Sequence, residues 1–196
     1  MLEIKDLSVQ YGKQAPTIEH FNLSMKKGEI ISVVGESGSG KTTVIRAVLG
    51  ALAGGGRVST GDIQFHGHSL LSNTKDEWRN LRGTRISMIF QQPQSALNPV
   101  FRAGDQISEV LNIHQDFGKE AGKNRAIELL KLVGIPEPDS RAESFPHELS
   151  GGMAQRVMIA MALACVPDLL IADEPTTALD VTIQAQILDL MRDMRS

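Results

Sequence analysis

Alternating apolar and polar residues predict β-strands near the start of the chain. Residues 2–9 (LEIKDLSV) and 18–25 (IEHFNLSM) alternate with a period of two, which is typical of strands with one exposed face. The shorter segments at 61–65 (GDIQF) and 85–90 (RISMIF) predict two further strands. We therefore expect a β-rich edge in the N-terminal part of the chain.

Two short runs that are rich in apolar residues predict strands that are buried in a sheet. Residues 29–34 (EIISVV) are rich in β-branched side chains and break at Gly35, and residues 169–172 (LLIA) end at Asp173. The apolar residues of these runs do not alternate with polar ones, which is typical of a strand that is covered on both sides, as in α/β proteins.

Apolar residues at helical spacing predict helices between these strands. From about residue 95 to 133 they recur every three or four positions, first from Ile107 and again from Ala126. Further helices are predicted at 42–52, 151–165 and around 187–194. The pattern as a whole indicates an α/β core with a helical insert at about 95–150.

The composition of the chain excludes several kinds of protein. The 196 residues carry 20 Lys and Arg against 23 Asp and Glu, a net charge of −3 that gives no electrostatic reason to expect nucleic-acid binding. The single cysteine, Cys165, excludes an internal disulfide and a cysteine-based zinc cluster. No signal peptide is visible, because the first residues (MLEIKDLSVQYG) alternate charged and apolar side chains. No membrane span is visible either: the uncharged run from Val157 to Val166 is far shorter than the ~20 residues that cross a bilayer.

A glycine-rich loop follows the first apolar run. Gly35–Thr42 (GESGSGKT) matches the pattern G-x-x-x-x-G-K-[ST], whose glycines allow successive backbone N–H groups to point at phosphate oxygens. Lys41 can reach the β- and γ-phosphates, and the Thr42 hydroxyl can bind Mg²⁺, whereas Thr43 is expected to pack. The alternative is a glycine-rich turn that only caps a helix; the strand predicted before the loop favours phosphate binding.

Two adjacent carboxylates follow the second apolar run. Ligands bind at the carboxyl ends of the strands of an open parallel sheet, which places Asp173 where it can hold Mg²⁺ through its water shell. Side chains alternate along an extended segment, so Glu174 faces another way and can orient or deprotonate an attacking water. The alternative is a solvated strand end with two surface acids.

A second glycine motif precedes the helix predicted at 151–165. Ser150 is a good N-cap, and Gly151 and Gly152 leave backbone amides open to an anion. Taken alone, this motif is also explained by an ordinary capped helix. Together with the first loop, it predicts a head-to-tail pair of chains, in which each lends this helix start to the nucleotide of the other.

The three motifs resemble the ATP-binding subunit of ATP-binding cassette (ABC) transporters. Gly35–Thr42, Leu149–Met153 and Leu169–Glu174 occur in that family's order, and the resemblance covers essentially the whole chain. It implies an α/β fold: a P-loop NTPase (RecA-like) core with an antiparallel β subdomain and a helical signature subdomain. Within one ATP-binding domain, 1–196, it implies the β subdomain and core at 1–94, the helical subdomain at about 95–150, and the signature helix, Walker B and D-loop at 151–196.

The resemblance also assigns roles to single residues. Tyr11 takes the place of the aromatic residue that stacks on adenine, Gln91 resembles the Q-loop glutamine, and Asp180 resembles the D-loop aspartate at the dimer interface. The respective alternatives are a surface aromatic, a polar residue at a strand end and a helix N-cap. Catalytic roles then fall to Glu174, Gln91 and Lys41, Mg²⁺ binding to Thr42, Gln91 and Asp173, and ATP binding to Tyr11, Gly35, Glu36, Ser37, Gly38, Ser39, Gly40, Lys41, Thr42, Thr43, Ser150, Gly151, Gly152 and Asp180.

Longer stretches narrow the resemblance to one branch. FPHELSGGMAQRVMIAMALAC, IADEPTTALDVTIQAQIL and MIFQQPQSALNPV are similar to the bacterial dipeptide, oligopeptide and nickel importers. The implied function is an ATP-hydrolysing subunit that energises a membrane importer, with di- or oligopeptides as the expected solute. The implied cofactors are ATP and Mg²⁺. The implied partners are a second ATP-binding subunit, transmembrane permease subunits and, indirectly, a solute-binding protein, at the cytoplasmic face of the inner membrane.

The sequence departs at three points from what the resemblance leads us to expect, although methionine at position 153 suits the importer branch. Gln92 stands where an acidic residue is expected, and Met153 where the wider superfamily has glutamine. The chain also ends before the strand that carries the family's switch histidine, so we expect a C-terminally truncated subunit with slow turnover. Three alternatives stay open: a truncated cassette that binds ATP or partners with little turnover, an importer subunit for nickel or another small solute, and a non-transport cassette ATPase.

Overall fold

The chain divides into two compact units, Met1–Arg79 and Asn80–Ser196, and the computed structural model describes residues 1–173. Three sequence predictions lie outside the described residues: Glu174, Asp180 and the helix around 187–194. Within residues 1–173, no helix combines the length and the apolar character that crossing a bilayer requires.

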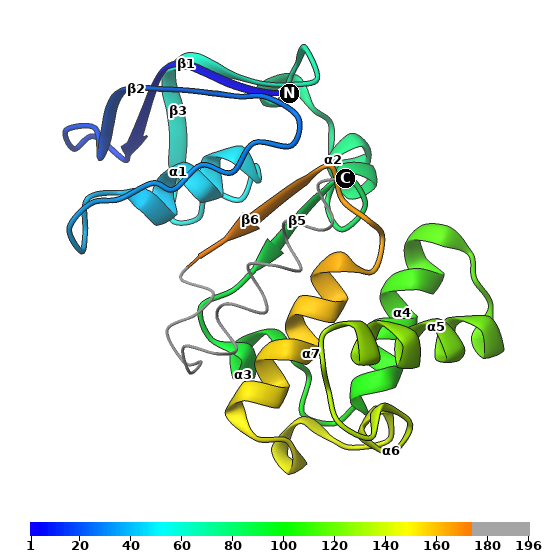
Figure 1. Cartoon of the computed structure of the whole chain (residues 1–196). Coiled ribbons are helices and arrows are strands. Elements are labelled where there is room, and N and C mark those ends of the chain that lie inside the picture. Colours follow the sequence, from blue (N-terminus) through cyan, green and yellow to red (C-terminus); the bar gives the residue numbers. More distant parts are fainter. Residues whose placement is uncertain (174–196) are drawn as a thin grey trace. The chain divides into compact units, whose positions relative to one another are not determined.

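The first unit is built on a four-stranded antiparallel sheet in the order β2-β1-β3-β4 (Figure 1). Leu7, Val9 and Ile63 are fully buried on its inner face, because the alternating pattern turns apolar side chains to one side. The strands predicted at 2–9 and 18–25 are confirmed, and the strand predicted at 61–65 begins earlier. The strands are β1 (Leu2–Tyr11), β2 (Ile18–Met25), β3 (Gly56–Phe65) and β4 (His68–Ser69).

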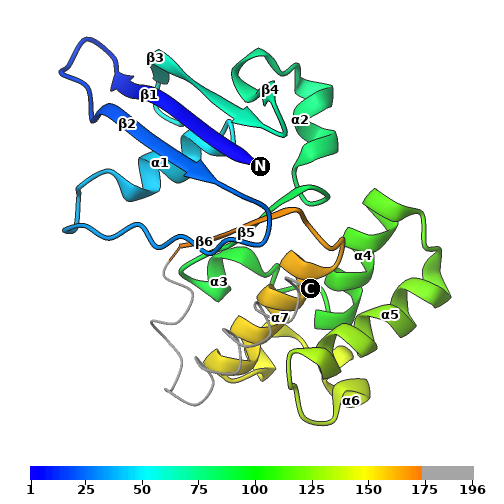
Figure 2. The same cartoon turned by 45° about the horizontal axis from the view of Figure 1, so that its top comes forward.

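Helix α1 (Lys41–Val48) lies along one side of this sheet (Figure 2). It is shorter than the predicted 42–52, because Gly50 adopts a left-handed φ of 59° directly after the helix, a common way for a helix to end. The side chain of Trp78 lies against Gly50: a Cβ there would come within 2.3 Å of the indole. The remaining elements of this part are the 3₁₀ turn η1 (Leu70–Ser72) and α2 (Lys75–Leu81).

The prediction of a buried strand at 29–34 is wrong for this structure. The segment forms no strand, and Ile30, Val33 and Val34 are 58%, 47% and 91% exposed. A buried strand requires neighbours that accept its backbone hydrogen bonds and layers that cover both faces. The strands of the first unit pair only with one another, so nothing in the described part of that unit supplies these neighbours.

The second unit combines a parallel pair of strands with a group of helices (Figure 1). Helix α7 is almost entirely apolar and packs against α3, α4, α5 and β5, which makes it the centre of the hydrophobic core. The elements are β5 (Ile86–Ile89), α3 (Pro93–Ala96), α4 (Ala103–Gln115), α5 (Lys119–Leu132), α6 (Pro138–Ala142), the 3₁₀ turn η2 (Pro146–Glu148), α7 (Gly151–Leu163) and β6 (Leu169–Ala172).

In the second unit, most of the residues that helical spacing predicts to be buried are buried, whereas the strand predicted to be buried is only partly so. Ile107 and Leu111 on α4 and Leu130 on α5 are fully buried, as their spacing predicts. On β6, however, only Leu169 is buried, because β6 has a single described neighbour, β5. Cys165 is buried as well, and burial raises the pKa of its thiol.

An exposed ion pair joins β1 to β2 and gives a pH-dependent prediction. Asp6 and His20 both have left-handed φ values, 50° and 51°, where the strand register shifts, and Asp6 Oδ1 lies 2.7 Å from His20 Nδ1. The hydrogen bond and charge of Asp6 raise the pKa of His20 above 6.5. The pair therefore stabilises the unit below pH 6.5, and this contribution is lost as the pH rises through the raised pKa.

We expect Asp6→Asn to lower the pKa of His20 towards its ordinary value, as read from an NMR titration of the imidazole. Asparagine tolerates the left-handed backbone as well as aspartate does, so the change removes the charge and leaves the turn intact. Asp76→Asn on α2 serves as the control and should leave this pKa where it is. A His20 pKa that stays raised in Asp6→Asn would show that Asp6 is not its cause.

Candidate functional site

The segment Gly35–Gly40 forms an exposed loop that leads directly into α1. Gly38 and Gly40 adopt left-handed φ values of 81° and 92°, which side-chain-bearing residues rarely reach. No side chain caps the start of α1. The first N–H groups of a helix have no partner inside it, so this start offers backbone donors and the positive end of the helix dipole to an anion.

The ammonium group of Lys41 folds back over the loop. Its Nζ donates hydrogen bonds to the carbonyl oxygens of Gly35 at 2.7 Å and Glu36 at 2.8 Å, and the N–H of Ser39 donates to Glu36 O at 3.2 Å. A lysine ammonium has three donors, so a third stays available to an anion held in the loop. The loop thus brings a positive charge and backbone N–H groups to one exposed place.

Gly40 is the position in this loop where a side chain is expected to do most harm. A Cβ at Gly40 would lie 2.2 Å from Ile18 Cδ1, whereas a Cβ at Gly38 meets no atom within 4 Å. Gly38→Ala should cost about 1–2 kcal/mol through its left-handed backbone alone. Gly40→Ala should cost about 1–3 kcal/mol more, because Ile18 must move. Urea denaturation of both variants checks this, and equal losses would contradict it.

The other predicted residues of the first unit have different surroundings. Thr42 is exposed at the start of α1, and Thr43 is half-buried. Tyr11 ends β1, and its ring lies against Gly56, where a Cβ would come within 2.5 Å of Tyr11 Cε1.

The parallel pairing of β5 with β6 brings two predicted magnesium ligands to the same end of the sheet. Ile89 pairs with Ala172, and the N–H of Asp173 donates to Ile89 O at 3.0 Å. Gln91 therefore follows β5 where Asp173 follows β6, at the carboxyl ends of both strands, the edge where α/β sheets bind ligands.

Sequence reasoning missed the contact that fixes this register from the other end. Arg85 Nε donates to Asp168 Oδ2, and the N–H of Leu169 donates to Arg85 O at 3.0 Å. Arg85 and Asp168 directly precede β5 and β6, so their contact aligns the two strands at the ends where they begin. No spacing rule links charges 83 positions apart, and only the parallel pairing of their strands could have suggested the contact.

The second glycine motif has the local geometry that its sequence predicts. Ser150 is the N-cap of α7, and its side chain accepts a hydrogen bond from the N–H of Met153 at 3.3 Å. Gly151 is exposed, and a Cβ built on it meets no atom within 4 Å. The helix start is therefore open to an approaching group.

The residues available for a magnesium ion are oxygen donors. The described residues contain no cluster of three or more histidine, cysteine, aspartate or glutamate side chains. A hydroxyl at Thr42, an amide at Gln91 and a carboxylate at Asp173 are the kinds of ligand that Mg²⁺ prefers. Each of these groups fits the ion in chemistry.

The glycine-rich loop leads into a helix that begins with Lys41 and has open N–H groups. This arrangement defines the class of P-loop nucleotide-binding proteins. Within that class, the family model described as ABC transporter matches residues 18–177, and the chain belongs to this family.

Solved structures confirm the predicted fold class. The ATP-binding cassette MJ0796, a dimer in a post-hydrolysis state bound to ADP and Pi, superposes with a TM-score of 0.87 at 29% sequence identity, over 100% of this chain and 83% of that one. A further dimeric structure of the same bacterial ABC transporter cassette gives 0.87 at 30% identity, with the same coverage.

Curated relatives are similar over the whole chain. It is 52% identical to the oligopeptide transport ATP-binding protein OppD of Bacillus subtilis, over 100% of this chain and 56% of the relative. It is 50% identical to the dipeptide transport ATP-binding protein DppD of Haemophilus influenzae, over 100% and 60%. The chain thus spans between half and two thirds of the length of these relatives.

Proposed function

We propose that this protein binds and hydrolyses ATP and energises a membrane importer for dipeptides or oligopeptides. The observation that carries the proposal is the exposed loop in which Lys41 and the open start of α1 face the same place. The names of the two relatives support the solute class, because both are ATP-binding proteins of peptide transport.

The chain's own groups account for nucleotide binding in two parts. The loop Gly35–Gly40 and the start of α1 hold the phosphates, with the Lys41 ammonium on the β- and γ-phosphates. The start of α7, at Ser150–Gly152, closes on the γ-phosphate of the ATP that a second copy holds, when the two copies associate head to tail. The dimeric state of the MJ0796 cassette supports this arrangement.

Hydrolysis needs a divalent ion and a positioned water. Mg²⁺ would neutralise charge that develops on the phosphates, and Thr42, Gln91 and Asp173 are the residues that would hold it. Glu174 follows Asp173 along the chain and would orient the attacking water or accept its proton. Tyr11 would stack on the adenine ring, and Asp180 would lie at the interface between the copies.

The subdomain boundaries and the location belong to the same proposal. The β subdomain and core occupy 1–94, the helical subdomain about 95–150, and the signature helix and acidic segment 151–196. The chain would act at the cytoplasmic face of the cell membrane, bound to permease subunits that cross it, with a solute-binding protein delivering peptide from the other side.

Calorimetry and sedimentation test the proposal together. We expect Mg-ATP to bind the purified chain and to shift it from monomer to dimer, and we expect ADP to bind without producing the dimer. A chain that shows no heat of binding with Mg-ATP and sediments identically with and without it would overturn the proposal.

A further inference from the structure

The stretch that joins α6 to the first turn of α7 is held by polar contacts and by two partly buried side chains, Leu149 and Met153, which pack against the core. Residues 143–153, all of which the structure describes, include no buried side chain, whereas Ala142 and Ala154 on either side of them are buried. The start of α7 lies inside this stretch. Its direction therefore depends on the packing of Leu149 and Met153 and, in addition, on the hydrogen bonds and ion pairs that fix the residues before Leu149.

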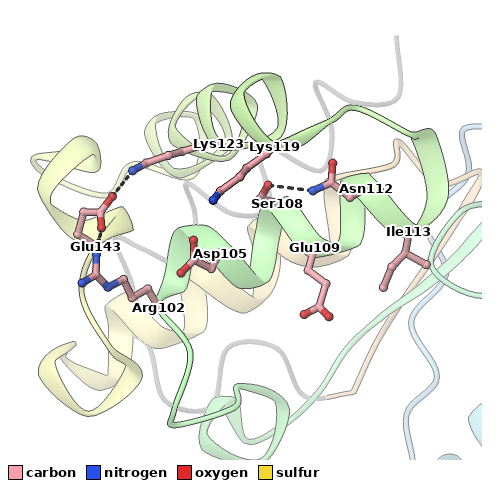
Figure 3. A pocket seen from close by; sticks show the side chains of 9 residues that line it. All are labelled: Arg102, Asp105, Ser108, Glu109, Asn112, Ile113, Lys119, Lys123 and Glu143. Atoms are coloured by element: carbon pink, nitrogen blue, oxygen red, sulfur yellow. Dashed lines mark hydrogen bonds and ion pairs between the residues drawn. The ribbon is translucent and has the colours of Figure 1, made fainter.

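Glu143 is the centre of those contacts. Its Oε2 accepts from Arg102, the residue before α4, and its Oε1 pairs with Lys123 on α5. Figure 3 shows the carboxylate of Glu143 between these two cations, at one end of a hollow of about 500 Å³ formed by α4 and α5. Hydrogen bonds from Lys123 and Arg102 lower the pKa of Glu143, so the group is ionised at neutral pH.

A chain of contacts runs from this cluster towards the start of α7. The N–H of Ala103 donates to Ser144 O at 2.9 Å, and the guanidinium of Arg102 lies 5.8 Å from the centre of the Phe145 ring. The Phe145 ring also stacks on His147, with centroids 5.7 Å apart.

The last contacts of this chain lie within the turn before α7. The Glu148 carboxylate accepts from the N–H of Phe145 at 2.7 Å, and the N–H of Leu149 donates to Pro146 O at 3.3 Å. Ser150, the next residue, is the N-cap of α7. Every residue from 143 to 149 except His147 thus has a hydrogen bond or ion pair within this chain of contacts, and His147 has its ring contact.

We propose that Glu143, held by Arg102 and Lys123, is a positioning residue that aims the start of α7 at the nucleotide of a second copy. The inference rests on the proposed function and goes beyond it, because none of these three residues belongs to a nucleotide-binding motif. Without the ion pairs of Glu143, α7 still packs in its core, but the backbone of residues 143–149 can take other conformations. Ser150 and Gly151 then meet the nucleotide less often in the right orientation.

Glu143→Gln tests this, because glutamine keeps the shape of the side chain and removes its charge. We expect the affinity for ADP, which is expected to bind without producing the dimer, to stay unchanged in calorimetry. The thermal unfolding midpoint should also stay unchanged, because exposed ion pairs contribute little to stability. ATP-dependent association, measured by sedimentation, should weaken by roughly two- to fivefold. Glu128→Gln, which breaks the exposed pair of Glu128 with Arg125 on α5, should change none of the three.

The outcomes separate the inference from the function on which it rests. An unmodified chain that associates with ATP, beside a Glu143→Gln chain that associates equally well, overturns the positioning role alone. Losses of nucleotide affinity or of the unfolding midpoint that match the loss of association show a general loss of structure and overturn it too. An unmodified chain that ignores Mg-ATP overturns the proposed function and this inference together.

Discussion

Lys41→Met is expected to weaken the binding of Mg-ATP by about 10- to 100-fold, since charge-assisted hydrogen bonds contribute about 1.5–3 kcal/mol and each 1.4 kcal/mol is a tenfold change. The ammonium group lies over the loop, on the carbonyl oxygens of Gly35 and Glu36, where phosphate oxygens are expected. Methionine keeps most of the length of the side chain and removes its charge. Isothermal titration calorimetry of both proteins measures the difference.

Lys27→Met is the matched control for this change. Lys27 is an exposed lysine of the same unit, outside the loop and outside α1. The control should bind Mg-ATP with unmodified affinity. Equal losses in the two variants would mean that overall charge, rather than the position of Lys41, decides nucleotide affinity.

Glu174→Gln is expected to slow ATP hydrolysis by about 10²–10⁴-fold, the usual contribution of a general base. The affinity for ATP should stay the same, because glutamine matches glutamate in shape and Lys41 still holds the phosphates. Phosphate formation, measured after acid quenching in single-turnover experiments, reads the chemical step directly. The ATP-bound dimer should then persist much longer than in the unmodified chain.

Glu120→Gln, an exposed change on α5, controls for the loss of a carboxylate elsewhere. It should hydrolyse ATP at the unmodified rate. A Glu174→Gln chain with unmodified turnover would remove Glu174 from the chemistry and leave the base to be found among other residues.

Local patterns predicted the fold best where an element needs only its own residues and one packing face. The alternation along β1 and β2 and the helical spacing along α4 and α5 can each be read from consecutive residues. The strands and helices that these patterns predict are confirmed. The run at 29–34 failed because a buried strand also depends on neighbours from elsewhere in the fold. The partial burial of β6 has the same physical reason: it has one described neighbour instead of two.

The candidate site shows the same division between local and distant signals. The glycines of the first loop and the Ser150 cap were readable because each motif lies within a few consecutive residues. The contact of Arg85 with Asp168 and the cluster around Glu143 were not, because their members are far apart and look like solvated surface charges in the sequence. The roles of Tyr11, Glu174 and Asp180 stay predictions.

Mixing two inactive variants tests most directly whether one nucleotide is shared between two copies. The first variant is Lys41→Met. The second is Gly151→Asp, which places a negative charge at the start of α7. A side chain there meets open space, and an acidic residue suits the first turn of a helix, so the variant is expected to fold.

In a mixed head-to-tail dimer, one site carries both changes and the other carries neither. We predict that each variant alone hydrolyses almost no ATP, and that an equal mixture regains up to about a quarter of the unmodified rate, because half of the dimers are mixed and each has one intact site of two. A mixture that stays as inactive as its components, or a Gly151→Asp chain with the full unmodified rate, would contradict the shared site.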